Sequence, residues 1–279
     1  MSIKNELDQY YTNPQYAKDC YDKSLQFISE RMDISTSYYL EPCVGTGSFY
    51  LQFPEDRRYG YDIEPVHLDE NVEHSDFLLE MGVNVRSNGE PILVISNPPF
   101  GKISSLAIKF FNKCASMHEV KYICFIVPKT FRKVATQNKL HANFHLVLDE
   151  DSPHDAFILH GEPHHVPCVF QIWERRDDET RDMHSIKNVS DYFQYCTKDE
   201  ADIFIKRVGT KAGEYAPPGK EHKDASMYYI KTDYIDEIID VLQSDDYMEE
   251  IKRIRKTTAG VFCVSKSELV LNIEKRLKI

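Results

Sequence analysis

The segment Val120–Val127, VKYICFIV, constrains the fold more than any other stretch of the chain. Its apolar side chains fall on both faces of an extended segment, which is typical of a central parallel strand covered on both sides. Helical spacing is expected over residues 6–31, with a turn at Thr12–Pro14, and over Ile103–Met117. Further strands are predicted at Ser37–Leu40, Arg58–Ile63, Ile92–Ile95, Phe144–Leu148 and Val166–Trp173. This alternation predicts an open α/β sheet with helices on both faces.

The composition changes near Glu174, where the charged run ERRDDETRDMHS begins. We interpret residues 1–176 as the main domain, 177–195 as a linker or surface loop, and 196–279 as a small C-terminal α/β unit. In the small unit, strands are expected at Ile203–Val208 and Met227–Ile230, and amphipathic helices at Tyr234–Gln243 and Lys266–Leu277.

Charge and cysteine usage narrow the functional classes. The formal net charge is −11, which argues against a protein that coats nucleic acid by bulk electrostatics but leaves room for a local basic groove. Seven cysteines stand singly, without a CxxC pair, as expected for reduced thiols. No apolar run is long enough to span a bilayer, and the first residues lack the apolar core of a signal peptide. We expect a cytoplasmic, nucleoid or nuclear protein that is neither secreted nor bound to a membrane.

A turn with two glycines follows the first predicted strand, in LEPCVGTGSF from Leu40 to Phe49. Gly45 and Gly47 let the backbone approach a ligand closely, because they carry no Cβ atom. Glu41 stands beside this turn, and a carboxylate there suits a cationic ligand group better than a pyrophosphate. The third glycine of a dinucleotide fingerprint is also missing. An ordinary strand-to-helix turn is the alternative reading.

Acidic residues follow the next two segments. In YGYDIEP, Asp62 stands at the end of the second strand, where a ribose is held through its hydroxyls, and Glu64 is the alternate. In HSDFL, Asp76 can accept a hydrogen bond from an adenine amino group and Phe77 can lie against the ring. The alternatives are a solvated turn at Asp62 and a helix cap at Asp76.

The strand Ile92–Ile95 ends abruptly at SNPPFG. Two prolines form a rigid turn without N–H groups, so nearby carbonyls can point into a pocket as acceptors. Asn97 adds a side-chain acceptor, and Phe100 adds a flat aromatic face. Two acceptors and an aromatic face suit an exocyclic amine on a nucleobase, because the amine donates two hydrogen bonds while the base stacks.

These motifs, in this order, resemble the S-adenosylmethionine-dependent amino-methyltransferases that modify adenine N6, in the gamma-class order with the target-recognition part at the C-terminus. EPCVGTGSF, YGYDIEP, SDF and NPPF match the family's successive motifs, and YYTNPQYA and FIVPKTF resemble its flanking segments. The resemblance covers about residues 8–174 and implies a Rossmann-like methyltransferase sheet. It makes residues 196–279 a candidate for target recognition, by position alone.

Carried over residue by residue, the resemblance implies roles for two groups of side chains. The residues implied to bind S-adenosyl-L-methionine are Tyr11, Thr12, Glu41, Gly45, Gly47, Asp62, Asp76 and Phe77. The implied catalytic residues are Asn97, Pro98, Pro99 and Phe100, with Asn97 and the Pro98 carbonyl holding the target amine and Phe100 stacking on the base. Phe157 is the candidate for a second aromatic wall. Lys129 and Arg132 either meet phosphates beside the pocket or begin a solvated helix.

Adenine-N6 methylation of DNA is the first function hypothesis, and the same reaction on RNA, with a partner subunit, is the second. NPPF occurs in both classes, and the acidic charge fits an RNA enzyme that borrows binding surface from a partner. Cytosine N4, a protein glutamine and an inactive binding module are further alternatives, and a homo-oligomer is equally compatible. The histidines at 154, 160, 164 and 165, with Cys168, match no zinc spacing, so we expect no metal.

Overall fold

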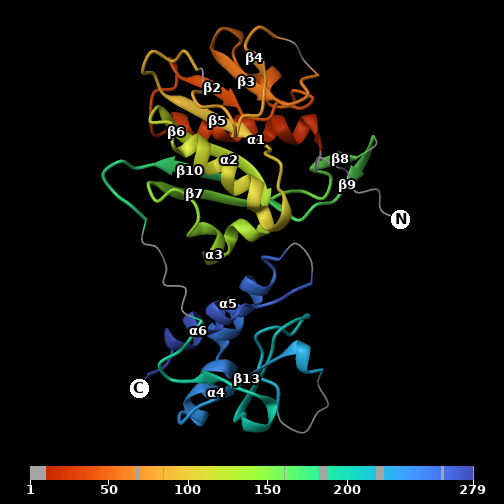
Figure 1. Ribbon diagram of the computed structural model, residues 1–279, viewed down its shortest axis with the longest axis vertical. Coiled ribbons are helices and arrows are strands. Elements are labelled where there is room, and N and C mark those ends of the chain that lie inside the picture. The colour runs from red at the N-terminus through yellow and green to blue at the C-terminus, as the bar shows by residue number, and fades with distance from the viewer. Residues whose placement is uncertain are drawn as a thin grey trace. The chain divides into compact units, whose positions relative to one another are not determined.

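The computed structural model describes residues 11–66, 69–83, 85–159, 161–181, 188–217, 223–258 and 261–278 (Figure 1). The chain divides into two compact units. The first comprises residues 1–131 and 136–183, and the second comprises 132–135 and 184–279. The change from one unit to the other at residue 183 falls within the segment 177–195 that composition marks as a linker.

A seven-stranded sheet forms the centre of the first unit. Its strands are β2 (Tyr38–Glu41), β3 (Arg58–Asp62), β4 (Val72–His74), β5 (Ile92–Ser96), β6 (Val120–Pro128), β7 (Phe144–Asp151) and β10 (Cys168–Arg175). The spatial order is β4-β3-β2-β5-β6-β10-β7. The first five strands run parallel, and β10 is antiparallel to both of its neighbours. The antiparallel strand inserted next to the edge distinguishes this sheet from the all-parallel dinucleotide-binding order.

Helices cover both faces of this sheet (Figure 1). Along β5 and β6, successive side chains alternate between two buried clusters because strand side chains point to opposite faces. Val94 and Ile123 pack in the cluster that contains helix α2 (Ser105–Ala115). Leu93 and Cys124 pack in the cluster that contains helix α1 (Pro14–Ser29). The Rossmann-like α/β fold expected from the sequence is therefore confirmed.

Helix α1 begins later than the predicted segment 6–31. The side chain of Asn13 accepts a hydrogen bond from the Gln15 backbone N–H at 2.9 Å, and Pro14 occupies the first helical position. Tyr11–Thr12 instead form strand β1, and residues 1–10 lie outside the described residues. The helix therefore starts at the turn predicted at Thr12–Pro14, and of the predicted segment only Tyr11–Thr12 are shown to be extended and not helical.

A small three-stranded sheet lies outside the main one and was not predicted. In it β1 pairs antiparallel with β8 (Phe157–Leu159), which pairs with β9 (Glu162–His164). Thr12 stands opposite Phe157 in this register. The pairing brings the start of the described chain to a hairpin about 145 residues further on.

The second unit packs an antiparallel sheet and helices around its own core. Its strands are β11 (Gln194–Tyr195), β12 (Ile203–Lys206) and β13 (Met227–Lys231), in the order β11-β13-β12. Its helices are α4 (Ile235–Gln243), α5 (Asp245–Arg255) and α6 (Lys266–Glu274); a short helix α3 (Val134–Gln137) precedes them in the chain. The shared core contains Ile230 from β13, Ile251 from α5 and Leu269 from α6. Helix α5 was not predicted as a helix separate from α4.

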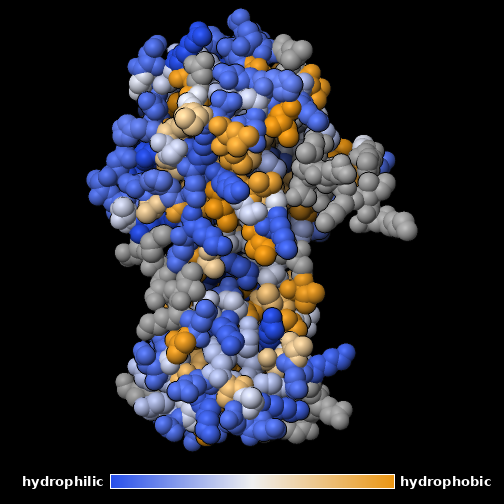
Figure 2. Space-filling view, viewed as in Figure 1, coloured by the Kyte–Doolittle hydropathy of each residue, from blue (hydrophilic) through white to orange (hydrophobic). Residues whose placement is uncertain are grey.

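Exposed apolar side chains are scattered among hydrophilic ones over the first unit (Figure 2). Among the described residues, no helix combines the length and apolar character that crossing a membrane requires.

Gly60 in β3 allows the loop after β2 to pack closely. A Cβ atom at this position would lie 2.5 Å from Cγ2 of Val44 and 3.1 Å from the Tyr50 ring. We expect Gly60→Ala to lower the free energy of unfolding by about 1–3 kcal/mol because the buried Val44 has to move. Gly82→Ala is the matched control, since nothing lies within 4 Å of its added methyl group. Urea denaturation of both variants tests this, and equal midpoints would contradict it.

Candidate functional site

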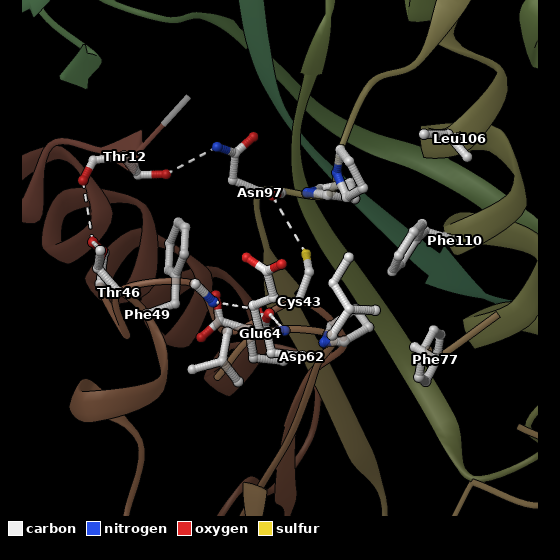
Figure 3. Close-up of a pocket in the computed structure, with 18 of the residues that line it drawn as sticks. Thr12, Cys43, Thr46, Phe49, Asp62, Glu64, Phe77, Asn97, Leu106 and Phe110 are labelled. Carbon is white, nitrogen blue, oxygen red and sulfur yellow. Dashed lines mark hydrogen bonds between the residues drawn. The ribbon is translucent and has the colours of Figure 1, made fainter. Parts of the chain in front are cut away.

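A cavity of about 410 Å³ lies at the carboxyl ends of the parallel strands β2, β3 and β5 (Figure 3). This is the edge at which open α/β sheets bind ligands. The cavity wall contains twelve of the residues singled out in the sequence: Tyr11, Thr12, Glu41, Gly45, Asp62, Glu64, Asp76, Phe77, Asn97, Pro98, Pro99 and Phe100. Five separate segments of the chain contribute them, so the fold gathers the motifs into one site.

The glycine turn after β2 is tied to the end of β3. The Gly45 backbone N–H donates to Oδ2 of Asp62 at 2.6 Å, and the Glu64 N–H donates to Oδ1 at 2.8 Å. Gly45 has a φ of +53°, in the region that glycine adopts without strain. Gly47 is absent from the cavity wall, but its N–H donates to the Val44 carbonyl at 2.8 Å and shapes the turn.

The wall of the cavity is acidic. Glu41, Asp62, Glu64 and Asp76 line it, and none of the described residues that line it is Lys, Arg or His. A cavity with this charge attracts a cation and repels a pyrophosphate. Among the described residues of the wall, no basic side chain balances the charge of these carboxylates. A cationic ligand would therefore be bound favourably.

Glu41 is the most deeply buried of these acids. Its side chain is 3% exposed, and Oε2 has no hydrogen-bond partner among the described residues. Burial raises the pKa of this carboxyl well above its ordinary value; a backbone hydrogen bond from Tyr50 opposes the rise and the nearby charge of Asp62 adds to it. A bound cation would offset the cost of ionising Glu41.

Thr12, near the start of the described chain, orients the Asn97 side chain. Nδ2 of Asn97 donates to Oγ1 of Thr12 at 3.1 Å, as the dashed line in Figure 3 shows. With Nδ2 directed to Thr12, Oδ1 lies at the opposite end of the amide. Pro98 and Pro99, which also line the cavity, lack N–H groups.

Two pairs of aromatic side chains pack at the site. Phe77 is 1% exposed and stacks on Phe110, with ring centroids 5.7 Å apart and planes 18° apart. Phe100 meets the edge of Phe157 at 6.4 Å and 89°. Phe157 is fully buried and absent from the cavity wall, so it supports Phe100 from behind and is not a second wall. Asp76 accepts from the Leu78 N–H at 2.9 Å through Oδ1.

Two further sequence candidates lie apart from the wall. Lys129 forms an ion pair with Asp151 at 2.9 Å, and neither it nor Arg132 lines the cavity. Among the described residues, no group of three His, Cys, Asp or Glu side chains could hold a metal ion. His154 and His165 stack with centroids 4.1 Å apart, and His160 lies outside the described residues.

Sequence reasoning missed several residues of the wall. Cys43 lies 3.1 Å from Oγ of Ser96 and donates through Sγ to the Asn97 carbonyl at 3.4 Å. Burial raises the pKa of its thiol, which keeps the proton needed for that bond. Leu106 and Phe110 reach the cavity from one face of α2. Their spacing of four residues is the signal that could have revealed them.

Comparison with known proteins agrees with a methyltransferase. The EDM2 methyltransferase-like domain family matches residues 57–186. No curated protein matches the chain.

Solved structures with some similarity include three nucleic-acid enzymes or complexes. PH1948 from Pyrococcus horikoshii, described as a candidate RNA methyltransferase, has 17% identity, covers 62% of this chain and 90% of its own, and has a TM-score of 0.47. The DrdV–DNA complex has 11% identity, 61% and 27% coverage and a TM-score of 0.44. The 23S rRNA methyltransferase ErmE has 12% identity, 96% and 99% coverage and a TM-score of 0.37.

The sheet of the first unit matches a Rossmann-like methyltransferase fold, and the methyltransferase-like family model matches part of this unit. Methyltransferases of this fold take their methyl group from S-adenosylmethionine. The residues present fit this molecule, because its sulfonium and ammonium groups are cationic and the wall carries a buried carboxylate oxygen without a partner among the described residues.

The raised pKa of Glu41 predicts that cofactor binding depends on pH. A bound cation favours the ionised form of Glu41. At pH values between the ordinary pKa of glutamate and the raised pKa of Glu41, binding of the cation therefore releases a proton from this side chain. Affinity should therefore increase with pH over that interval, with a slope approaching tenfold per pH unit. Glu41→Gln should flatten this slope, while the exposed Glu55→Gln should keep it. Isothermal titration calorimetry at several pH values measures both, and a slope unchanged in Glu41→Gln would contradict the role of Glu41.

Proposed function

We propose that the chain methylates the exocyclic N6 amine of adenine in nucleic acid, with DNA as the first substrate to test. The observation that carries this proposal is the Asn97–Phe100 turn, whose four residues line the same cavity as the buried Glu41, with the Asn97 amide held by a hydrogen bond to Thr12. Two acceptors beside an aromatic face match an amine with two hydrogens on a planar base.

S-adenosylmethionine, when bound, supplies an electrophilic methyl group on a sulfonium. Glu41 would compensate the cationic end of the molecule. Asp62 would accept from ribose hydroxyls through lone pairs that its two backbone bonds leave available. Asp76 and Phe77 would hold the adenine of the cofactor, with Phe110 behind Phe77 keeping that ring in position.

At the target, the chain's own groups act on the amine. Its nitrogen is a poor nucleophile because its lone pair is conjugated with the ring. Hydrogen bonds from the amine to Oδ1 of Asn97 and to the Pro98 carbonyl favour tetrahedral geometry and stabilise the positive charge that develops on nitrogen. The proton then leaves to water, so no strong base is required. Phe100, supported by Phe157, offers the stacking face for the base.

Asn97→Ala should reduce turnover by about 10²–10³-fold or more, because it removes a preorganised acceptor for the developing charge. Cofactor affinity should change little, since the cationic end of that molecule is assigned to Glu41. Single-turnover assays and calorimetry separate the two effects. The Thr12 pair tests the orientation of the amide: Thr12→Ser keeps the Oγ acceptor and should keep kcat, whereas Thr12→Val should lower kcat. Full turnover in Asn97→Ala would refute the assignment.

RNA is the second candidate substrate, and one observation favours it. The net charge of −11 leaves little bulk attraction for a polyanion, which suits an enzyme that shares its binding surface with a partner subunit. Incubation with labelled cofactor and DNA, total RNA or a protein extract, followed by digestion and mass identification, distinguishes the cases. N6-methyldeoxyadenosine supports DNA, and N6-methyladenosine supports RNA. A methylated protein residue as the sole product would overturn both.

We propose that the second unit contributes to holding the polymer. Lys266 Nζ lies 4.3 Å from the centroid of the Tyr195 ring, Tyr195 contacts Tyr228 at 5.6 Å, and the Arg207 guanidinium lies 5.8 Å from the Tyr228 centroid. Both cations are exposed, and neither has an ion-pair partner among the described residues. By contrast, two arginines of the other basic run, Lys252–Lys256, form ion pairs. Arg253 pairs with Glu250, and Arg255 pairs with Glu214.

Removing both cations, in Arg207→Ala with Lys266→Ala, should weaken nucleic-acid binding roughly tenfold at low salt. The slope of log affinity against log salt should decrease by about 2, because two phosphate contacts are lost. Lys252→Ala, which removes an exposed cation of the other run, is the control. Fluorescence anisotropy over a salt series measures the slope, and an unchanged slope in the double variant would exclude this surface.

A further inference from the structure

The segment between Phe100 and helix α2 has an unusual backbone. Ile103 and Ser104 have φ angles of +54° and +60°, in the left-handed region that non-glycine residues rarely adopt. For a β-branched residue such as Ile103 this conformation is especially unfavourable. Strained backbone persists only where the surroundings impose it, and it concentrates at functional sites.

The surroundings hold this segment from both sides. Oγ of Ser104 lies 2.6 Å from Oγ1 of Thr130, and Ser104 is 3% exposed. The Leu106 N–H donates to the Phe100 carbonyl at 3.1 Å. A Cβ atom on Gly101 would lie 2.7 Å from Cγ of Leu106, so the turn is closely packed there. Ile103 therefore lies between Gly101 and Ser104, which are both held by close contacts.

Despite these contacts, the Ile103 side chain is 77% exposed. Phe100 and Leu106, on either side of it in the chain, both line the cavity. The Cα atom of Ile103 can lie at most about 11 Å from that of Phe100. A strained backbone therefore presents an apolar side chain to solvent beside the proposed target pocket. Lys102, next to it, is exposed and has no ion-pair partner among the described residues.

We propose that Ile103 is a wedge that enters the base stack of a duplex as the target adenine leaves it. The inference rests on the proposed function and names the substrate class: base-paired nucleic acid. Apolar wedges held rigidly by the protein partly unstack base steps, and an extruded base requires such compensation only when it starts from a duplex. Lys102 would meet a neighbouring phosphate. A single-stranded target would gain nothing from an exposed, strained isoleucine.

The test compares kcat/KM for three forms of one oligonucleotide containing the methylated site found by product analysis. The forms are a fully paired duplex, the same duplex with an abasic position opposite the target adenine, and the single strand. Ile103→Ala should lower kcat/KM on the paired duplex by roughly 10–100-fold. The loss should shrink on the abasic duplex and stay within about twofold on the single strand, where nothing has to be unpaired. Met81→Ala, which removes an even more exposed apolar side chain outside the cavity wall, is the control and should behave as wild type.

Ile103→Gly separates a wedge from a structural role. Glycine relieves the positive φ, so this variant should melt at a higher temperature than Ile103→Ala while showing the same loss on the duplex. Equal losses on duplex and single strand, or no loss on the duplex, would overturn the wedge. A wild-type enzyme that acts on single strands alone would overturn the substrate class. Failure of the proposed function is distinct, because wild type would then methylate none of the three forms.

Discussion

One carboxylate, that of Asp62, holds two of the loops from which the cavity is built. Its oxygens accept from the backbone of Gly45 and of Glu64, so the glycine turn after β2 and the turn after β3 cannot separate without breaking a charge-assisted hydrogen bond. The parallel pairing of β2 and β3 brings these turns to the same edge, and Asp62 fixes their relative position there. The remainder of the wall is arranged around this connection.

The cavity also sets how a nucleic acid could approach it. Four acidic side chains line the wall, so phosphates are repelled from the interior while an uncharged base and a cation are admitted. Lys102 is exposed and follows Phe100, a residue of the cavity wall, by two positions. The two exposed cations that lie near tyrosine rings, Arg207 and Lys266, belong to the second unit. Attraction for the polymer and the chemistry of the base are thus assigned to different groups. This separation is compatible with a net charge of −11.

Much of the site could be predicted because its motifs follow strands, and the carboxyl ends of parallel strands meet at one edge. Turn residues such as Gly45, Asp62 and Asn97 therefore converge whatever the details of packing. Features that depend on distant pairing could not be predicted. Phe157 is buried behind Phe100 because β8 pairs with β1, and Lys129 is directed to Asp151, which ends a different strand.

Short elements escaped prediction for a related reason. Strand β4 has three residues and no apolar alternation, and the β8–β9 hairpin depends on a turn at Gly161 with a φ of +84°. Helix α5 begins directly after Ser244, which ends α4 and also caps α5 by accepting from the Tyr247 N–H. Two charged helices joined by one residue have no loop to mark the boundary.

The two-residue strand β1 gives the site a weak point of its own. The geometry around Asn97 depends on Thr12, and Thr12 is held by its pairing with Phe157 and by the neighbouring bond from the Asn13 N–H to the Ala156 carbonyl at 2.9 Å. So short a ladder can open locally at a far smaller free-energy cost than the seven-stranded sheet. The orientation of the amide and the part of the cavity wall that β1 supplies therefore belong to a less stable cooperative unit than the main sheet, and heating can disorder them while that sheet survives.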